Sequence, residues 1–177
     1  MALFYFWDGE EVKIPANISY KKLKAVRQAQ RLWRSAKGNN VKFSTKLEAH
    51  GWVRAGFGSF KQCYSKGSIV VKYSTHNGNN WEVKREWEQW NCAPKGLRKH
   101  LPWTYCILDG RVLIQDRVLC KKGSAWQNNL ASKFELKDQG HNYGYSKRGV
   151  VKFYDWVYRR DNNHVDDHDL PLTKKYR

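Results

Sequence analysis

Glycines and a lysine about a third of the way along the chain have the types and spacing of a phosphate-binding site. The stretch GFGSFK (56–61) places Gly56 and Gly58 two residues apart, and glycines in such a turn let backbone N–H groups approach phosphate oxygens. The β-branched run IVVKY (69–73) then carries Lys72, whose ammonium group could reach the same oxygens. A Gly-x-Gly pair alone is also typical of an ordinary hairpin. The elements predicted around these residues distinguish between a phosphate-binding turn and an ordinary hairpin.

The clearest of these elements is a helix predicted over 19–38. Ser19 suits its N-cap and Gly38 its C-terminal stop. Its apolar face comprises Ala25, Val26, Ala29, Leu32, Trp33 and Ala36, and its opposite face carries Lys21, Lys24, Arg27, Arg31 and Arg34. The stretch contains seven basic residues and no acid. Such a stripe is either a solvated face or a contact for phosphates or an acidic partner.

Strands are predicted from 41 to 75, where Lys72 lies. They are VKFSTKLE, GWVRAGFG, SFKQCYSKG and SIVVKYS. A second helix is predicted to begin after Asn79 or Asn80 and to run to about Cys92. Its expected buried stripe is Val83, Trp87 and Trp90.

The remaining predicted elements are shorter. LFYFW (3–7) reads as a strand before an Asp8-Gly9 turn. WTYCILDGRVLIQDRVL (103–119) reads as a hairpin that turns at Asp109-Gly110. The other segments are a short helix at 124–136, a last strand at 149–156 and a polar tail.

The order of these elements resembles the protein-kinase-like fold, in the compact form of small bacterial and bacteriophage kinase-like proteins. The resemblance covers residues 48–156 and rests on four stretches. They are GFGSFK (56–61), IVVKY (69–73), KDQGHNYGY (137–145) and VVKFYDW (150–156). It implies an α+β fold: a truncated protein-kinase-like fold with an antiparallel sheet, an αC-type helix, a minimal C-lobe and an extra N-terminal basic helix.

The length of 177 residues predicts one domain over 1–177, large enough for a core of its own, and we divide it into four parts. They are an N-terminal strand and basic helix (1–47), an N-lobe-like part (48–120), a reduced C-lobe-like part (121–156) and a polar tail (157–177).

The resemblance also implies a role for each site residue. Gly56, Gly58 and Lys72 would contact the phosphates of ATP, and a helical glutamate would hold Lys72. Among Glu82, Glu86 and Glu88, we predict Glu86, because it lies nearest the apolar stripe of its helix. The alternative is that Glu82 and Glu86 pair with Lys84 or Arg85 on the helix surface.

The third and fourth stretches supply the remaining implied roles. Asn142 and Asp155 would hold Mg²⁺ between phosphate oxygens, and Asp138 would act as the base. His141 could substitute for Asp138, although a loop histidine is more often structural.

Three departures from the family's pattern weaken the expectation of catalysis. Lys61 stands where the third glycine of the turn would be. Asp138 and Asn142 are four residues apart, whereas the family has five. Only 22 residues follow Asp155, which leaves no room for the lobe that seats a peptide substrate.

Composition indicates a basic, aromatic-rich protein. Lys and Arg number 33 and Asp and Glu 16, for a formal charge of +17, which attracts polyanions or acidic protein faces. Nine tryptophans, ten tyrosines and seven phenylalanines imply an aromatic core or stacking surface. The four cysteines form no Cys-x-x-Cys pair, which disfavours a zinc ribbon and suits reduced thiols in the cytoplasm. We expect neither a signal peptide nor a membrane span.

Three functions compete on this basis. The favoured one is a basic pseudokinase-like effector of phage origin, which binds a host nucleic acid or acidic protein complex and inhibits host machinery or defence. The alternative is an active ATP-dependent kinase. A third is a metal-dependent nuclease built on Glu82-x-Lys84, although that motif lies in a predicted helix. The tail motif HVDDHD (164–169) could bind a metal but reads more simply as a solvated acidic patch.

Overall fold

A computed structural model gives the fold. It describes the backbone of residues 2–7, 10–57, 61–75, 80–93 and 95–120, together with short strands at 136–137, 143–145, 151–153 and 157–158. The chain forms two compact units and is of the α+β class. The first unit comprises Met1–Trp87 and Trp103–Arg117, and the second comprises Glu88–Pro102 and Val118–Arg177.

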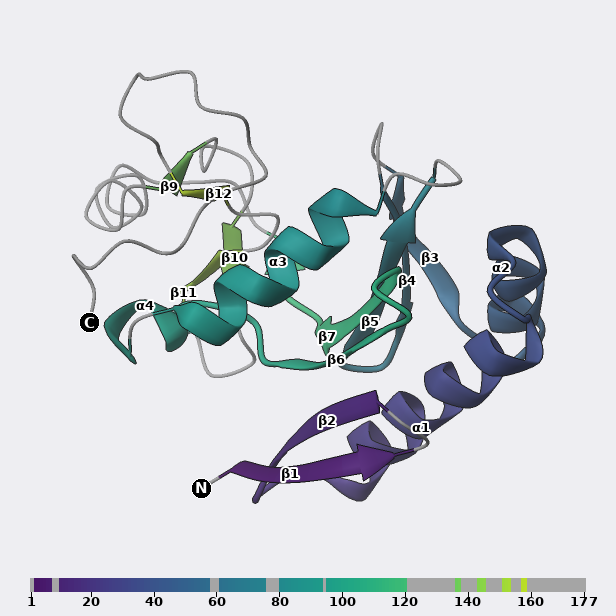
Figure 1. The fold of residues 1–177 in the computed structure, drawn as a ribbon, viewed down its shortest axis with the longest axis horizontal. Helices are drawn as coiled ribbons and strands as arrows, with labels where there is room; N and C mark the ends of the chain where they lie inside the picture. Colours follow the sequence, from purple (N-terminus) through teal and green to yellow (C-terminus); the bar gives the residue numbers. More distant parts are fainter. Residues whose placement is uncertain are drawn as a thin grey trace. The chain divides into compact units, whose positions relative to one another are not determined.

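A five-stranded antiparallel sheet organises the first unit (Figure 1). Its strands are β3 (Val53–Phe57), β4 (Lys61–Lys66), β5 (Ile69–Ser74), β6 (Thr104–Leu108) and β7 (Val112–Asp116), in the order β3-β4-β5-β7-β6. The predicted hairpin is confirmed at β6–β7. Both Asp109 and Gly110 have positive φ, at 50° and 63°, as the two central residues of a type I′ turn require.

Helix α1 (Tyr20–Ser35) confirms the prediction of a capped amphipathic helix. The Ser19 side chain accepts a hydrogen bond from the backbone N–H of Lys22. Gly38 follows the helix with φ of +70°, which L side chains rarely adopt. All six residues of the predicted apolar face are buried in the hydrophobic core.

Helix α2 (Asn40–Ala49) corrects the prediction of a strand at 41–48. The Asn39 side chain caps it by accepting from the backbone N–H of Lys42, at 2.9 Å. Phe43 and Leu47, one helical turn apart, are completely buried. Their burial at helical spacing, together with the cap, explains why this segment is a helix.

The N-terminal segment forms a hairpin of β1 (Ala2–Trp7) and β2 (Glu10–Pro15). The strand predicted at 3–7 is therefore confirmed, and β2 was not predicted. Val12 and Ile14 of β2 belong to the core, and the indole N–H of Trp103 donates to the carbonyl of Lys13 at 2.9 Å. The hairpin thus packs against the body of the first unit.

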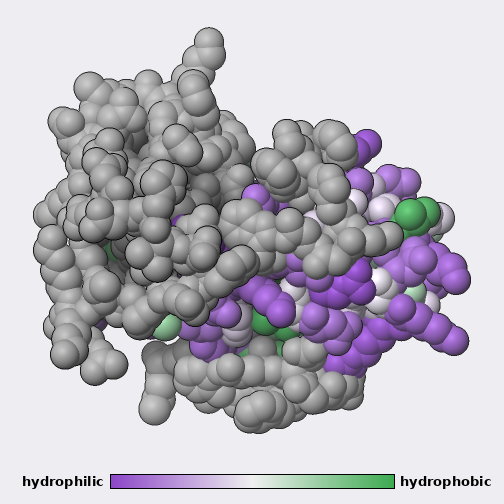
Figure 2. Space-filling view, turned by 45° about the horizontal axis from the view of Figure 1, so that its top comes forward, coloured by the Kyte–Doolittle hydropathy of each residue, from purple (hydrophilic) through white to green (hydrophobic). Residues whose placement is uncertain are grey.

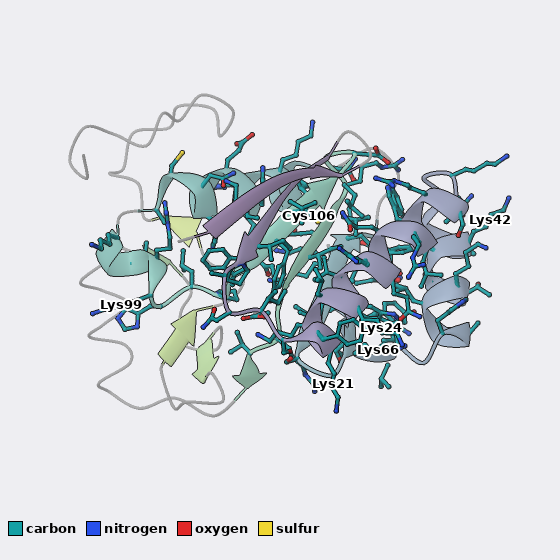
Figure 3. The ribbon with its side chains drawn as sticks, turned by 90° about the horizontal axis from the view of Figure 1, so that it is seen from below. Lys21, Lys24, Lys42, Lys66, Lys99 and Cys106 are labelled. Carbon is teal, nitrogen blue, oxygen red and sulfur yellow. The ribbon has the colours of Figure 1, made fainter. Side chains whose placement is uncertain are left out.

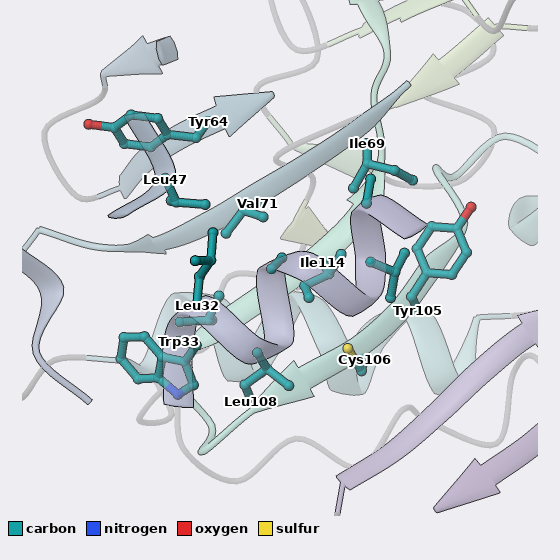
Figure 4. Packing of buried hydrophobic residues seen from close by; sticks show 14 of the residues in the cluster. Leu32, Trp33, Leu47, Tyr64, Ile69, Val71, Tyr105, Cys106, Leu108 and Ile114 are labelled. Carbon is teal, nitrogen blue, oxygen red and sulfur yellow. The ribbon is translucent and has the colours of Figure 1, made fainter. Parts of the chain in front are cut away.

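The core lies between α1, α2 and one face of the sheet (Figure 4). Strand alternation places Tyr64, Val71, Tyr73 and Ile114 on this face. An aromatic chain runs through it, with ring centroids 5.1 Å apart for Trp33–Phe43, 5.4 Å for Phe43–Tyr73 and 6.2 Å for Tyr64–Tyr73. The aromatic composition is therefore used, at least here, for core burial.

Helix α3 (Trp81–Cys92) matches the predicted second helix, and Asn80 accepts its first backbone hydrogen bond, from Lys84. Val83 and Trp90 are buried as predicted, but Trp87 is only partly buried. Glu86 is buried instead, with 3% of its surface exposed.

The second unit contains α4 (Lys95–Arg98) and two small antiparallel sheets. One sheet orders β11 (Val151–Phe153), β10 (Tyr143–Tyr145) and β8 (Leu119–Cys120), and the other pairs β12 (Val157–Tyr158) with β9 (Leu136–Lys137). The strand predicted at 149–156 corresponds to β11. The predicted helix at 124–136 lies, apart from Leu136, outside the described residues, as do the tail beyond Tyr158 and the site residues Gly58, Asp138, Asn142 and Asp155.

Candidate functional site

The candidate site lies on the sheet face opposite the aromatic core. Cys63 pairs with Lys72 and Lys61 with Ser74 in the β4–β5 register, so these four side chains share one face. Ser65 and Val70 continue this face along the strands, and Gln115 of β7 lies opposite Val70. Four of its polar residues, Ser65, Lys72, Ser74 and Gln115, are buried. A buried sheet face with so many polar side chains is unusual, and each of them needs a partner.

Lys72 and Glu86 form a buried ion pair on this face. Lys72 Nζ donates to Glu86 Oε1 at 2.7 Å, and the two side chains are 7% and 3% exposed. Glu86 reaches the sheet because it lies one helical turn after the fully buried Val83. The predicted contact between Lys72 and Glu86 is therefore present, whereas the third candidate, Glu88, is exposed.

Lys61 also belongs to this cluster, although the sequence interpretation treated it only as a missing glycine. Lys61 Nζ lies 3.6 Å from Glu86 Oε2 and 3.9 Å from Glu82 Oε2, and its side chain is 13% exposed. Strand alternation places Lys61 on the same sheet face as Lys72, because Lys61 lies two residues before Cys63, which pairs with Lys72. This alternation was the signal in the sequence that could have identified Lys61.

The cluster pairs two lysines with two glutamates. Each lysine ammonium group has three N–H donors, so contact with one carboxylate oxygen leaves donors for other acceptors. Charges buried without compensation would be costly, and the two glutamates compensate the two lysines. Of the two predicted glycines, Gly56 lies in β3 and Gly58 lies outside the described residues.

Clusters of metal-ligating side chains are relevant to the predicted magnesium site. Among the described side chains, no group of three or more His, Cys, Asp or Glu residues is arranged to hold a metal ion. The predicted ligands Asn142 and Asp155 and the tail motif HVDDHD belong to the segments outside this description. Within the described residues, Cys63, Cys92 and Cys106 form no disulfide bond.

The basic side of α1 faces solvent. Lys21, Lys24, Arg27 and Arg31 are exposed, and Arg34 is half-buried. Figure 3 shows Lys21, Lys24 and Lys66 at this part of the unit, and Lys66 Nζ donates to Gln28 Oε1 of α1 at 2.8 Å. The described surface visible in Figure 2 is mostly hydrophilic.

One basic residue of α1 is used inside the unit. Lys22 Nζ lies 2.7 Å from Asp116 Oδ1, and the Tyr105 hydroxyl donates to the same oxygen at 2.7 Å. Lys22 therefore links α1 to the end of β7 through an ion pair. It was not among the residues predicted for the basic face of this helix.

The other predicted features are placed as follows. Glu82 and Lys84 both lie in α3, so the Glu-x-Lys motif is not on a nuclease-type strand. Lys95, Arg98 and Lys99, an alternative basic surface, are exposed. Arg98 also donates to the carbonyls of Asn91 and Ala93.

Comparison with known proteins gave no match among family models, curated proteins or solved structures. None of the described helices is long and apolar enough to span a membrane.

Proposed function

We propose that this protein is a kinase-like binding protein that holds the phosphates of a nucleoside triphosphate at Lys72 and acts on an anionic partner through the basic side of α1. The observation that carries the proposal is the buried Lys72–Glu86 pair. In protein kinases, a strand lysine held by a glutamate from the next helix contacts the phosphates. Here the lysine of β5 and the glutamate of α3 are in hydrogen-bond contact.

A purely structural role explains this pair less well. A buried ion pair is weak support for stability, because desolvation offsets most of the attraction between its charges. A hydrophobic pair would fill the same space on the sheet face without that penalty. Buried charges that persist beside a glycine-containing hairpin are therefore better explained by ligand binding.

The nucleotide proposal assigns the remaining roles by resemblance. Mg²⁺ would be held by Asn142 and Asp155, and Asp138 would be the base of any residual transfer. The spacing of four residues from Asp138 to Asn142, where the kinase family has five, favours a pseudokinase over an efficient enzyme.

The partner proposal depends on charge. A row of exposed Lys21, Lys24, Arg27 and Arg31 on one helix suits a nucleic-acid backbone or an acidic protein face. The compact, basic and aromatic-rich chain supports the further proposal of a phage protein that inhibits host machinery or defence in the host cytoplasm.

Calorimetric titration with ATP and Mg²⁺ tests the nucleotide role. We expect weak binding by the natural protein and its loss in Lys72→Ala. Lys84→Ala serves as the matched control, because Lys84 is exposed on α3, two residues from Glu86. Absence of binding at millimolar ATP would remove the nucleotide role.

Active phosphotransfer is the second candidate, and the intact Lys72–Glu86 contact favours it. Incubation with γ-labelled ATP and host proteins would reveal it. Efficient labelling that Asp155→Asn abolishes would show that the protein is an enzyme.

A further inference from the structure

We propose that the exposed face of α1 binds the sugar–phosphate backbone of B-form duplex DNA. This inference rests on the basic partner surface of the proposed function and commits that surface to one partner. It is independent of the nucleotide role proposed for Lys72.

The sign of the charges on the two N-terminal helices is the first argument. From Ala16 to Leu47 the chain has nine lysines and arginines and no aspartate or glutamate. Those of the nine that are exposed are Lys21, Lys24, Arg27, Arg31, Lys37 and Lys42, three of which are labelled in Figure 3. A surface of a single sign, spread over α1 and α2, attracts a polyanion.

The line in which the cations of α1 lie is the second argument. Positions 20, 24, 27 and 31 fall within about 60° around a helix axis, because an α-helix turns by about 100° per residue. They carry Tyr20, Lys24, Arg27 and Arg31, and all four side chains are exposed. This line is about 16 Å long, and duplex DNA carries about one negative charge per 1.7 Å of its axis. The duplex therefore has a phosphate for each cation, and a tyrosine hydroxyl can donate to phosphate as well.

The polarity of this face is the third argument, and it favours DNA over an acidic protein. Interfaces between proteins have an apolar or aromatic centre from which lysine is depleted, whereas protein–DNA interfaces are more polar and much more positive. Among the described residues, the exposed large hydrophobic side chains are Tyr20, Val41 and Val53. Of these, Tyr20 alone belongs to α1, and it lies at the first position of the helix. The basic face of α1 therefore has no apolar centre.

The form of the nucleic acid follows from the same face. Proteins that bind single strands stack successive bases on several aromatic side chains, and α1 exposes one, Tyr20. The major groove of A-form RNA is too deep and narrow for side chains to read, whereas that of B-DNA, about 12 Å wide, admits an α-helix. Contacts to phosphate carry no sequence information, so two duplexes of unrelated sequence should bind alike.

Fluorescence anisotropy with labelled DNA duplexes of about 20 base pairs, at salt concentrations from about 50 to 200 mM, tests the inference. The variant is Lys24→Gln/Arg27→Gln/Arg31→Gln, and the matched control is Lys84→Gln/Lys95→Gln/Arg117→Gln, which removes three exposed charges elsewhere. Each lost phosphate contact lowers the slope of log K against log salt by about 0.9, so the variant should lose about 2–3 of the slope and the control less than about 1. Arg27→Lys/Arg31→Lys keeps the charges and should keep the slope.

The same titrations with single-stranded DNA, duplex RNA and polyglutamate decide the partner. An unchanged slope in the α1 variant, or an equal fall in the control, would overturn the inference. Binding of any of these three probes as tight as that of duplex DNA would also overturn it, and polyglutamate bound through α1 would leave the acidic protein partner of the proposed function standing. If the natural protein binds none of the probes, the partner role itself fails, while titration with ATP still judges the nucleotide role.

Glutamine is a good helix former, so α1 should persist in the variant, and circular dichroism checks this. If the triple variant does not fold, the single variants Lys24→Gln and Arg31→Gln take its place. Each should lower the slope by about 0.9, and an unchanged slope in both would overturn the inference.

Discussion

Replacing Glu86 by leucine should destabilise the protein strongly, because it leaves a buried lysine without its carboxylate. Lys72 is 7% exposed, and within the described residues its ammonium group has Glu86 as its hydrogen-bond partner. Breaking a buried pair by removing one partner costs about 3–5 kcal/mol. This is a large part of the about 5–15 kcal/mol by which folded domains are stable.

The reverse change, Lys72→Met, should cost less. Glu86 would still have Lys61 at 3.6 Å, so its charge would remain partly compensated. We expect a loss of about 1–3 kcal/mol. The double variant Glu86→Leu/Lys72→Met should regain most of the stability, because a hydrophobic pair can replace a buried ion pair at little cost.

Urea-induced unfolding, followed by tryptophan fluorescence, measures these differences. With a slope of about 2 kcal/mol per molar urea, Glu86→Leu should lower the midpoint by about 2 M. A loss below about 1 kcal/mol for Glu86→Leu would refute burial of the pair. A greater loss for Lys72→Met than for Glu86→Leu would refute the sharing of Glu86 with Lys61.

Three further predictions concern α1, α2 and the tyrosines. Replacing Lys24, Arg27, Arg31 and Arg34 together by glutamine should leave the melting curve nearly unchanged but should weaken binding to an anionic partner, most strongly at low salt. If the affinity depends on salt concentration as it does for the natural protein, the interface must instead involve Lys95, Arg98, Lys99, Lys121 and Lys122. Asn39→Ala should lower the free energy of unfolding by about 1 kcal/mol through loss of the α2 cap, whereas no change in a urea titration would contradict the cap. Burial raises the pKa of Tyr73, and burial with the charge of Asp116 raises the pKa of Tyr105. Because a tyrosine in the unfolded chain ionises at about pH 10, these two residues stabilise the fold fully below that pH, and their contribution declines above it. The test uses variants in which only these two tyrosines can ionise. Phenolate absorbance at about pH 10 without loss of the circular dichroism signal would contradict their burial.

Elements with local signals could be predicted from the sequence. Ser19, the helical spacing of apolar residues and Gly38 mark α1 without any tertiary information. Asp109-Gly110 likewise marks the β6–β7 turn, because few other dipeptides adopt positive φ at both positions.

Helix α2 shows how a local pattern can mislead. Val41, Phe43 and Thr45 alternate in the manner of a strand, and β-branched residues favour strands. The packing of Phe43 between Trp33 and Tyr73 outweighs that tendency, and neither neighbour is close to it in sequence. Only the Asn39 cap and the spacing from Phe43 to Leu47 signalled a helix.

The candidate site was predictable where helix periodicity and family resemblance agreed. Together they identified Glu86 as the residue that contacts Lys72, which the geometry bears out, while its role toward a nucleotide stays a prediction. Lys61 was missed because the glycine-rich pattern identified it only as a position without the expected glycine. That pattern gives no information about the ion pair that the lysine side chain forms with Glu86. The pairing of β5 with β7 brings together segments about 40 residues apart, which no local signal specifies.

The core between the sheet and the two N-terminal helices has a consequence for truncation. Residues 1–47 lie outside the stretch that resembles kinases, yet Trp33, Phe43 and Leu47 cover Tyr64, Val71 and Tyr73. A chain shortened to begin at residue 48 would keep β3 at the edge of the sheet but would present the aromatic sheet face to water, and it should aggregate. The N-terminal helices α1 and α2 are therefore part of the hydrophobic core. Any recombination or deletion that separates them from the sheet should yield insoluble protein.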